Sequence, residues 1–179
     1  MINPRQYSFY TFADQVYCDF MMDIMQNLEP ISLPKKTFIF DELEEVQLIY
    51  FFMKGTYEIG YSINLDKKFM LRYKNYSVVG IYNVTFFKRS AYIYRSATPC
   101  SGYFIRRQKW RDIMDNNDGP LCSEFKDQIA KEFEVKIKKK MDVKKSSELK
   151  RLSLRADFES HKFTSGIYDQ GILKSALRE

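Results

Sequence analysis

The sequence has 179 residues, which suits one domain with a hydrophobic core and a short appendage and is too short for two full-sized domains. Hydrophobic residues make up 45% of the chain, and 13 Tyr with 15 Phe predict a packed, aromatic-rich core rather than disorder. The formal net charge is +6, and a single histidine with three scattered cysteines leaves zinc coordination, Ser-His-Asp catalysis and a disulfide framework without their usual residues.

The sequence carries no signal for a membrane span or for export. No apolar run approaches the roughly 18 residues that cross a bilayer, and residues 1–6 are not followed by the apolar core of a signal peptide. An odd number of unclustered cysteines indicates a reducing compartment. We therefore expect a protein that is not an enzyme, holds no metal and needs no cofactor, located in the cytoplasm or on the cytoplasmic face of a membrane.

The positive charge is concentrated in residues 126–155, which hold 11 Lys and Arg against 5 Asp and Glu, while the rest of the chain is balanced. Two interpretations stay open: a solvated helix face and tail, or a surface that contacts anionic lipid headgroups or an acidic partner. Nucleic acid is not an expected partner, because no recognition motif accompanies the charge.

Along the chain, the first predicted element is a helix over residues 11–27 with Thr11 as its N-cap. Apolar residues recur at every fourth position of this segment: Phe12, Val16, Phe20, Ile24 and Leu28. Pro30 and Pro34 end the helix. Residues 1–34 are therefore interpreted as an N-terminal helical segment or linker.

Residues 36–106 are rich in Phe, Tyr, Ile and Val in short runs that favour strands. The predicted strands cover residues 36–40, 46–53, 56–63, 68–73, 77–80, 90–96 and 99–105. Gly55 and residues 66–68 are interpreted as hairpin turns. Many short strands at this spacing are typical of an antiparallel roll rather than of βαβ units.

Helical periodicity returns after the strands. A short helix is predicted over residues 108–117, residues 116–120 break it, and a longer helix is predicted over residues 121–140. The longer helix carries an apolar residue at every fourth position: Leu121, Phe125, Ile129, Phe133 and Ile137. Residues 35–140 are thus expected to form one α+β domain, a jelly-roll-like antiparallel β-roll of seven to eight short strands flanked by helices. Residues 141–179 are expected to be a charged, loosely ordered tail.

Residues 79–93 combine the groups that a phosphate cradle needs. Gly80 follows a strand, a short connection comes next, and Arg89-Ser90-Ala91 then enters another strand. Backbone N–H groups near a glycine, one guanidinium and a small hydroxyl are suited to bind a phosphate.

This segment resembles the phosphate-binding cassette of the cyclic-nucleotide-binding domain family, which reads Phe-Gly-Glu, a short helix, then Arg-(Ala/Ser/Thr)-Ala. Ile81 stands where the family has its glutamate, and Tyr82 follows. Further landmarks are residues 49–59, similar to the family's Ile-Tyr-Phe-Ile-x-x-Gly-x-Val-Glu-Val, and residues 103–110, similar to its last strand and first post-roll helix. The likeness covers about residues 30–140. It looks closest to the cytoplasmic C-terminal domains of voltage-gated and cyclic-nucleotide-modulated cation channels, especially protist potassium channels.

The resemblance implies roles for individual residues. Those aligned with the cassette are Gly80, Ile81, Tyr82, Arg89, Ser90 and Ala91. Leu71 and Tyr73 fall where the family lines the base side of the pocket. Phe125, Ile129 and Phe133 lie on the helix that closes over the ligand as a lid.

The missing glutamate directs the functional hypotheses, because in the family it accepts the ribose 2′-hydroxyl and Ile81 accepts nothing. A charge-assisted pair from Arg89 contributes about 1.5–3 kcal/mol, less than the roughly 4.1 kcal/mol of even millimolar binding. The leading hypothesis is a regulatory module with a degenerate pocket that acts on a channel transmembrane domain or a larger assembly. The alternatives are a working cAMP or cGMP sensor that gates a channel, and a stand-alone scaffold or interaction subunit.

Overall fold

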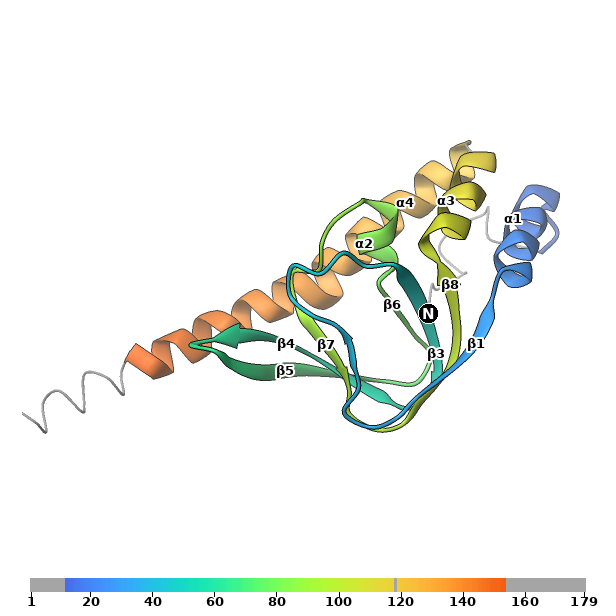
Figure 1. Cartoon of the computed structure of the whole chain (residues 1–179). Coiled ribbons are helices and arrows are strands. Elements are labelled where there is room, and N and C mark those ends of the chain that lie inside the picture. Colours follow the sequence, from blue (N-terminus) through green and yellow to red (C-terminus); the bar gives the residue numbers. More distant parts are fainter. Residues whose placement is uncertain (1–11, 118, 154–179) are drawn as a thin grey trace, which may run out of the picture. The chain divides into compact units, whose positions relative to one another are not determined.

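The structure is a computed structural model that describes residues 12–117 and 119–153. The chain divides into two compact units, residues 1–138 and residues 139–179, which are treated separately below. Eight strands and the helices α1 to α4 belong to the first unit (Figure 1). The strands are β1 (Glu29–Leu33), β2 (Phe38–Phe40), β3 (Leu48–Lys54), β4 (Thr56–Ile63), β5 (Asp66–Lys74), β6 (Ser77–Val79), β7 (Ile93–Ser96) and β8 (Cys100–Arg106). The helices are α1 (Gln15–Gln26), α2 (Ile81–Thr85), α3 (Arg107–Asn116) and α4 (Pro120–Phe133), followed by a π-helical turn, η2 (Glu134–Lys138).

The eight strands form two four-stranded sheets, in the orders β1-β8-β3-β6 and β2-β7-β4-β5, and every pair is antiparallel. The predicted antiparallel β-roll flanked by helices is therefore confirmed. Aromatic residues hold its interior together: the ring of Phe52 on β3 lies 5.9 Å from that of Tyr57 on β4, and Tyr57 in turn stacks near Tyr94 on β7. The side chains of Phe52, Tyr57 and Tyr94 are all buried.

One strand was not predicted. β1 spans Glu29–Leu33 and pairs with β8, with Pro30 opposite Tyr103. Pro30, inside this strand, and Pro34, directly after it, were interpreted as helix terminators. β1 is an edge strand with a neighbour on one side alone, and an edge tolerates a proline because its missing N–H need not join a ladder.

The turn between β4 and β5 also differs from the prediction. It is formed by Asn64 and Leu65, which have φ values of 50° and 69°, and β5 already begins at Asp66. Two consecutive residues with positive φ are typical of a type I′ hairpin turn. The predicted turn residues 66–68 belong to the strand, where Lys67 forms an ion pair with Asp41.

The N-terminal helix begins later than predicted. Asp14 is the N-cap of α1, and its carboxylate accepts hydrogen bonds from the N–H groups of Val16 (2.9 Å) and Tyr17 (3.3 Å). Thr11, the predicted cap, lies outside the described residues. The predicted apolar stripe is buried in part: Phe20 and Ile24 are buried, whereas the first two members, Phe12 and Val16, are exposed.

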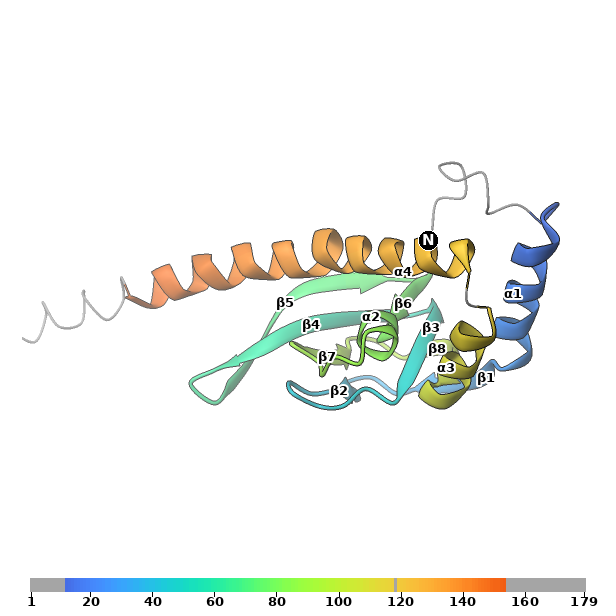
Figure 2. The ribbon, with the colours of Figure 1, turned by 90° about the horizontal axis from the view of Figure 1, so that it is seen from above.

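Helices α1 and α3 lie at one end of the roll, and α4 begins there and runs along the roll toward α2 (Figures 1 and 2). Phe125 of α4 contacts both Phe20 of α1 and Trp110 of α3, at ring distances of 5.4 and 6.2 Å. The Trp110 indole N–H donates to the Thr85 hydroxyl at 3.0 Å, which ties α3 to α2.

The predicted long helix is interrupted. α4 ends at Phe133, and residues 134–138 form the wider π-helical turn η2. In the second unit, residues 139–153 are helical, although a loosely ordered tail was expected from residue 141; residues 154–179 lie outside the described residues. No helix in the described part of the chain combines the length and apolarity that crossing a bilayer requires.

Candidate functional site

Gly80 stands where β6 turns into α2, and no other residue fits this position without strain. Its φ is 88°, in the left-handed region that L side chains avoid. A Cβ added to Gly80 would lie 2.7 Å from the carbonyl oxygen of Leu48 and 3.1 Å from a methyl carbon of Val46. The backbone thus approaches β3 closely at the point where the resemblance places the cassette glycine.

Asn83 closes the connection from α2 to Arg89. Its buried amide donates to the carbonyl oxygens of Lys88 (3.3 Å) and Arg89 (3.0 Å), and the Lys88 N–H donates to the Asn83 carbonyl (2.9 Å). These bonds fold the cassette connection onto itself. The sequence analysis did not select Asn83, and a single asparagine in a short connection gives no signal that would have found it.

Arg89 and Ser90 pair with the segment that follows β2. The Ser90 N–H donates to the Glu44 carbonyl (2.9 Å), and the Leu43 N–H donates to the Ser90 carbonyl (2.8 Å). The exposed Arg89 guanidinium donates to the Leu43 carbonyl at 3.3 Å. The buried Ser90 hydroxyl donates to the Tyr92 carbonyl at 2.6 Å, and Ala91 is exposed. The polar groups of Arg89 and Ser90 therefore already hold backbone partners of this chain.

Tyr82 lies face to face with Phe133 of α4. The two ring centroids are 3.9 Å apart and the planes are inclined by 3°. Phe86 of the cassette and Tyr92 flank the stack, with ring distances of 5.1 Å to Tyr82 and 6.4 Å to Phe133, respectively. The cassette helix α2 and the predicted lid helix are thus in direct aromatic contact.

Tyr73 connects β5 to the end of the lid. Its hydroxyl donates to the backbone carbonyl of Lys136, inside the π-helical turn η2, and its ring stacks on Tyr57 at 5.5 Å. Burial raises the pKa of the Tyr73 hydroxyl. Leu71, the other residue predicted to line the base side, is half-buried and lies opposite Ile59 in the β4–β5 ladder.

The three predicted lid residues do not contact the same part of the molecule. Phe133 contacts the cassette through Tyr82, whereas Phe125 packs against α1 and α3. Ile129, one turn from each, is buried. The structure therefore brings together Tyr82, Phe133 and Tyr73 around η2 and separates Phe125 from them.

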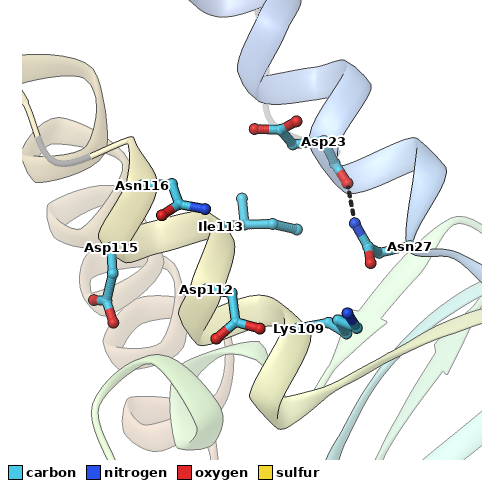
Figure 3. A pocket seen from close by; sticks show the side chains of 7 residues that line it. All are labelled: Asp23, Asn27, Lys109, Asp112, Ile113, Asp115 and Asn116. Atoms are coloured by element: carbon cyan, nitrogen blue, oxygen red, sulfur yellow. Dashed lines mark hydrogen bonds between the residues drawn. The ribbon is translucent and has the colours of Figure 1, made fainter.

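A hollow on the described surface lies away from the cassette, between α1 and α3 (Figure 3). It has a volume of about 570 Å³ and is lined by three aspartates and a lysine: Asp23, Asp112, Asp115 and Lys109. A surface with this excess of carboxylates repels a phosphate. Among the described residues, no group of His, Cys, Asp and Glu has an arrangement that suits a metal ion.

No protein-family model matches the sequence, and no curated protein matches it either. Solved structures do match the fold. One, described as Sp-2Cl-cAMPS bound to PKAR CBD2, has a TM-score of 0.54 and 15% identity, with 78% of this chain and 80% of that chain covered. Another is the c-di-GMP responsive global regulator CLP of Xanthomonas campestris, with a TM-score of 0.53, 14% identity and coverage of 76% and 64%.

A third is the regulatory domain of Toxoplasma gondii PKA with cAMP, with a TM-score of 0.50 and 12% identity over 53% of this chain. This chain spans 36% of that protein's length, so it corresponds to one part of it. At these identities the likeness concerns the backbone arrangement. The chain has the antiparallel β-roll fold of these cyclic-nucleotide-binding domains.

Proposed function

We propose that this chain is a regulatory module without catalytic activity, in which the cyclic-nucleotide pocket of the fold is degenerate and the lid is held on the cassette by the chain's own side chains. The observation that carries the proposal is the face-to-face stack of Tyr82 on Phe133 at 3.9 Å. Aromatic stacking of this kind contributes about 0.5–1.5 kcal/mol beyond the burial of its surface. The stack joins α2 of the cassette to α4 through side chains of this chain.

Three further features of the cassette support a degenerate pocket. Ile81 offers no oxygen to a ribose hydroxyl at the position where the family has a glutamate. The Arg89 guanidinium donates to the Leu43 carbonyl, and the Ser90 hydroxyl donates to the Tyr92 carbonyl. The Ser90 hydroxyl would have to give up its bond to the Tyr92 carbonyl before it could donate to a phosphate, and it would regain little net free energy in the exchange.

The regulatory partner that we propose is the transmembrane domain of a cation channel, with the module on its cytoplasmic side. The sequence landmarks at residues 49–59 and 103–110 favour this assignment, and the regulatory names of the structural neighbours support a non-enzymatic role. Movement of α4 relative to the roll would transmit the signal, because α4 contacts α2 and reaches η2, where Tyr73 is bound. Whatever stabilises one position of α4 then biases the partner.

Thermal unfolding in the presence of nucleotide tests the degenerate pocket. A ligand that binds the native state stabilises it by RT ln(1 + [L]/Kd), about 2.7 kcal/mol at a hundredfold excess over Kd. We expect millimolar cAMP or cGMP to leave the melting temperature unchanged. A rise of several degrees with either nucleotide would contradict the proposal.

The second candidate is a working cyclic-nucleotide sensor, which the left-handed Gly80 and the solvent-accessible Arg89 favour. In that case Arg89→Glu should abolish the thermal shift and leave the melting temperature of the free protein within a degree or two, because the single bond of Arg89 to Leu43 is exposed. Lys88→Glu is the matched control, since it reverses the neighbouring charge. An equal loss of the shift in both variants would show that net charge, and not the cassette arginine, binds the nucleotide.

A scaffold subunit is the third candidate, and the basic helix favours it. Lys139, Lys140 and Lys144 are exposed on the helix of the second unit. Binding of the chain to vesicles rich in phosphatidylserine should then weaken steeply as salt is raised. Absent or salt-insensitive binding removes the membrane contact.

A further inference from the structure

Phe87, at the end of the cassette connection, is an aromatic side chain held out in solvent. It is 63% exposed, and its φ of 54° lies in a region that bulky residues rarely adopt. A strained backbone persists when its surroundings fix it, and such strain concentrates at functional sites. Here the surroundings are guanidinium groups: that of Arg111 lies 4.5 Å from the ring centroid and that of Arg107 lies 5.9 Å away.

Both arginines project from the same face of α3, because residues four apart on a helix are neighbours. The backbone N–H of Arg107 donates to the Gln47 carbonyl at 2.8 Å, which fixes the start of α3 against the roll. Trp110 anchors the same helix to Thr85. The guanidinium groups are therefore presented by a rigid element.

The cluster has more positive charge than the carboxylates near it neutralise. Arg107 forms an ion pair with the exposed Glu45, while neither Arg89 nor Arg111 forms an ion pair with any described residue. The hydrogen bond from Arg107 and then its charge, with further contributions from Arg89 and Arg111, hold the pKa of Glu45 below its usual value. Glu45 thus contacts one guanidinium group, that of Arg107, and lies within the electrostatic influence of two more.

Two guanidinium N–H groups of the cluster donate no hydrogen bond to any described residue. The Nε atoms of Arg107 and Arg111 are buried without a hydrogen-bond partner among the described residues. Lys126 and Asp115 line a small hollow together with Phe87 and Arg111, and their charges offset each other. An arginine fork donates two parallel bonds to a planar or tetrahedral oxyanion, and an unpaired buried N–H favours an acceptor.

We propose that Arg107 and Arg111, which meet at Phe87, form together with Arg89 a binding site for a phosphate monoester dianion on a phosphorylated segment of a partner protein. The three guanidinium groups and Glu45 together carry a net charge of +2, and a dianion neutralises it. The exposed ring of Phe87 provides an apolar contact for a residue next to the phosphate. Glu45 is the intramolecular competitor, because its carboxylate accepts a hydrogen bond from one terminal nitrogen of Arg107. The site shares Arg89 with the cassette and adds Arg107 and Arg111 of α3, so its test uses variants of α3 and of Glu45 rather than of Arg89.

The test is a calorimetric titration of the full chain with a phosphoserine peptide and with its unphosphorylated form, supported by NMR signals of the arginine Nε–H groups. We expect the phosphorylated peptide to bind about tenfold or more tightly than the other. Inorganic phosphate should compete with it, whereas chloride at equal ionic strength should not. Equal affinity of the two peptides would overturn the proposal.

Three variants distinguish a built site from diffuse charge. Arg111→Gln should weaken phosphopeptide binding about tenfold, and Glu45→Gln should strengthen it severalfold by freeing the Arg107 fork. Lys109→Gln is the matched control: it removes the same charge from α3, but its side chain lines the acidic hollow with Asp112. An equal loss in Lys109→Gln, or no gain in Glu45→Gln, would overturn the proposal. The Glu45→Gln arm is independent of any folding defect in Arg111→Gln, because Glu45 is exposed.

A membrane is the other source of phosphate groups. Vesicles of phosphatidic acid should compete with the phosphopeptide no more strongly than inorganic phosphate does at the same concentration of accessible phosphate groups. Tight vesicle binding without measurable phosphopeptide binding would contradict the proposal and assign the cluster to a lipid surface.

Discussion

Gly80 meets two separate requirements for a residue without a side chain, a left-handed φ of 88° and the nearby Leu48 carbonyl. Gly80→Ala is expected to lower the free energy of unfolding by about 2–3 kcal/mol, because the positive φ alone costs about 1–2 kcal/mol and the Cβ also collides with backbone. Urea denaturation measures this loss.

Gly119→Ala is the control for that substitution. Gly119 has an extended φ of −176° and no heavy atom within 4 Å of an added Cβ. Its cost should stay below about 1 kcal/mol, the usual effect of an N-cap change. Equal losses at Gly80 and Gly119 would show that the close approach to Leu48 is not a constraint.

Individual residues of the site differed in how far the sequence could predict them. Gly80 was predictable because a glycine at the end of a strand and before a short connection has a physical reason, the unusual backbone conformation that it allows. Asn83 was not, since its role depends on two carbonyls that only the folded loop brings within 3.3 Å. The outward direction of Arg89 was equally hidden, because a sequence does not show where a guanidinium points.

At the scale of elements, the contact between α2 and α4 is the feature on which regulation would depend. A double-mutant cycle with Tyr82→Ala and Phe133→Ala should give a coupling free energy of about 0.5–1.5 kcal/mol in urea denaturation. The control cycle pairs Tyr82→Ala with Phe125→Ala, because Phe125 lies on the same helix but contacts Phe20 and Trp110. Coupling as large in the control cycle would refute a specific stack.

The bond from Tyr73 to the Lys136 carbonyl anchors the π-helical turn to β5. Tyr73→Phe should cost about 0.5–1.5 kcal/mol, the net contribution of a typical hydrogen bond. Amide hydrogen exchange in residues 134–138 should become faster, since the turn loses its tie. Tyr103→Phe, at an exposed position on β8, should change neither quantity. Unchanged exchange in Tyr73→Phe would mean that η2 is held by other contacts.

Elements with strong periodicity were predictable, and irregular ones were not. The apolar pattern located β3 to β8 and both C-terminal helices to within a few residues. It missed β1, because the prolines at 30 and 34 outweighed a short edge strand. It also missed the end of α4 at Phe133, because the apolar stripe continues to Ile137 through the π-helical turn without any change in the sequence pattern.

At the scale of the whole molecule, the buried tyrosines make the free energy of unfolding depend on pH in the alkaline range. Burial raises the pKa of Tyr57 and Tyr94 above the ordinary value of 10.0. Both hydroxyls therefore stay protonated in the folded chain while the unfolded chain ionises. Their contribution is complete below pH 10 and is lost as the pH rises above it.

We expect the free energy of unfolding to fall steadily as the pH rises above 10, with the tyrosinate absorbance of the buried tyrosines appearing together with unfolding. Tyr76→Phe is the control, because Tyr76 is 58% exposed and its removal should leave this dependence intact. Ionisation of all tyrosines without loss of structure would contradict a buried aromatic core.

The pairing of strands into two sheets is the part of the molecule that the sequence could not specify. Short strands with similar composition do not reveal that β6 joins β3 while β7 joins β4. The order of roll, cassette and lid was nevertheless predictable, because a glycine or a change in the periodicity of apolar residues marks where each begins. Only the packing of the folded chain shows that Phe133 contacts the cassette while Phe125 contacts α1 and α3.

The most direct test of the account measures the contact between Tyr82 and Phe133 in solution. Nuclear Overhauser effects between the two rings should be present in the nucleotide-free chain, as the 3.9 Å stack requires, and should be unchanged by millimolar cAMP or cGMP. If the ring-to-ring signals are absent without nucleotide, or vanish when cAMP is added, the lid is not held by the chain's own side chains and the pocket belongs to a working sensor.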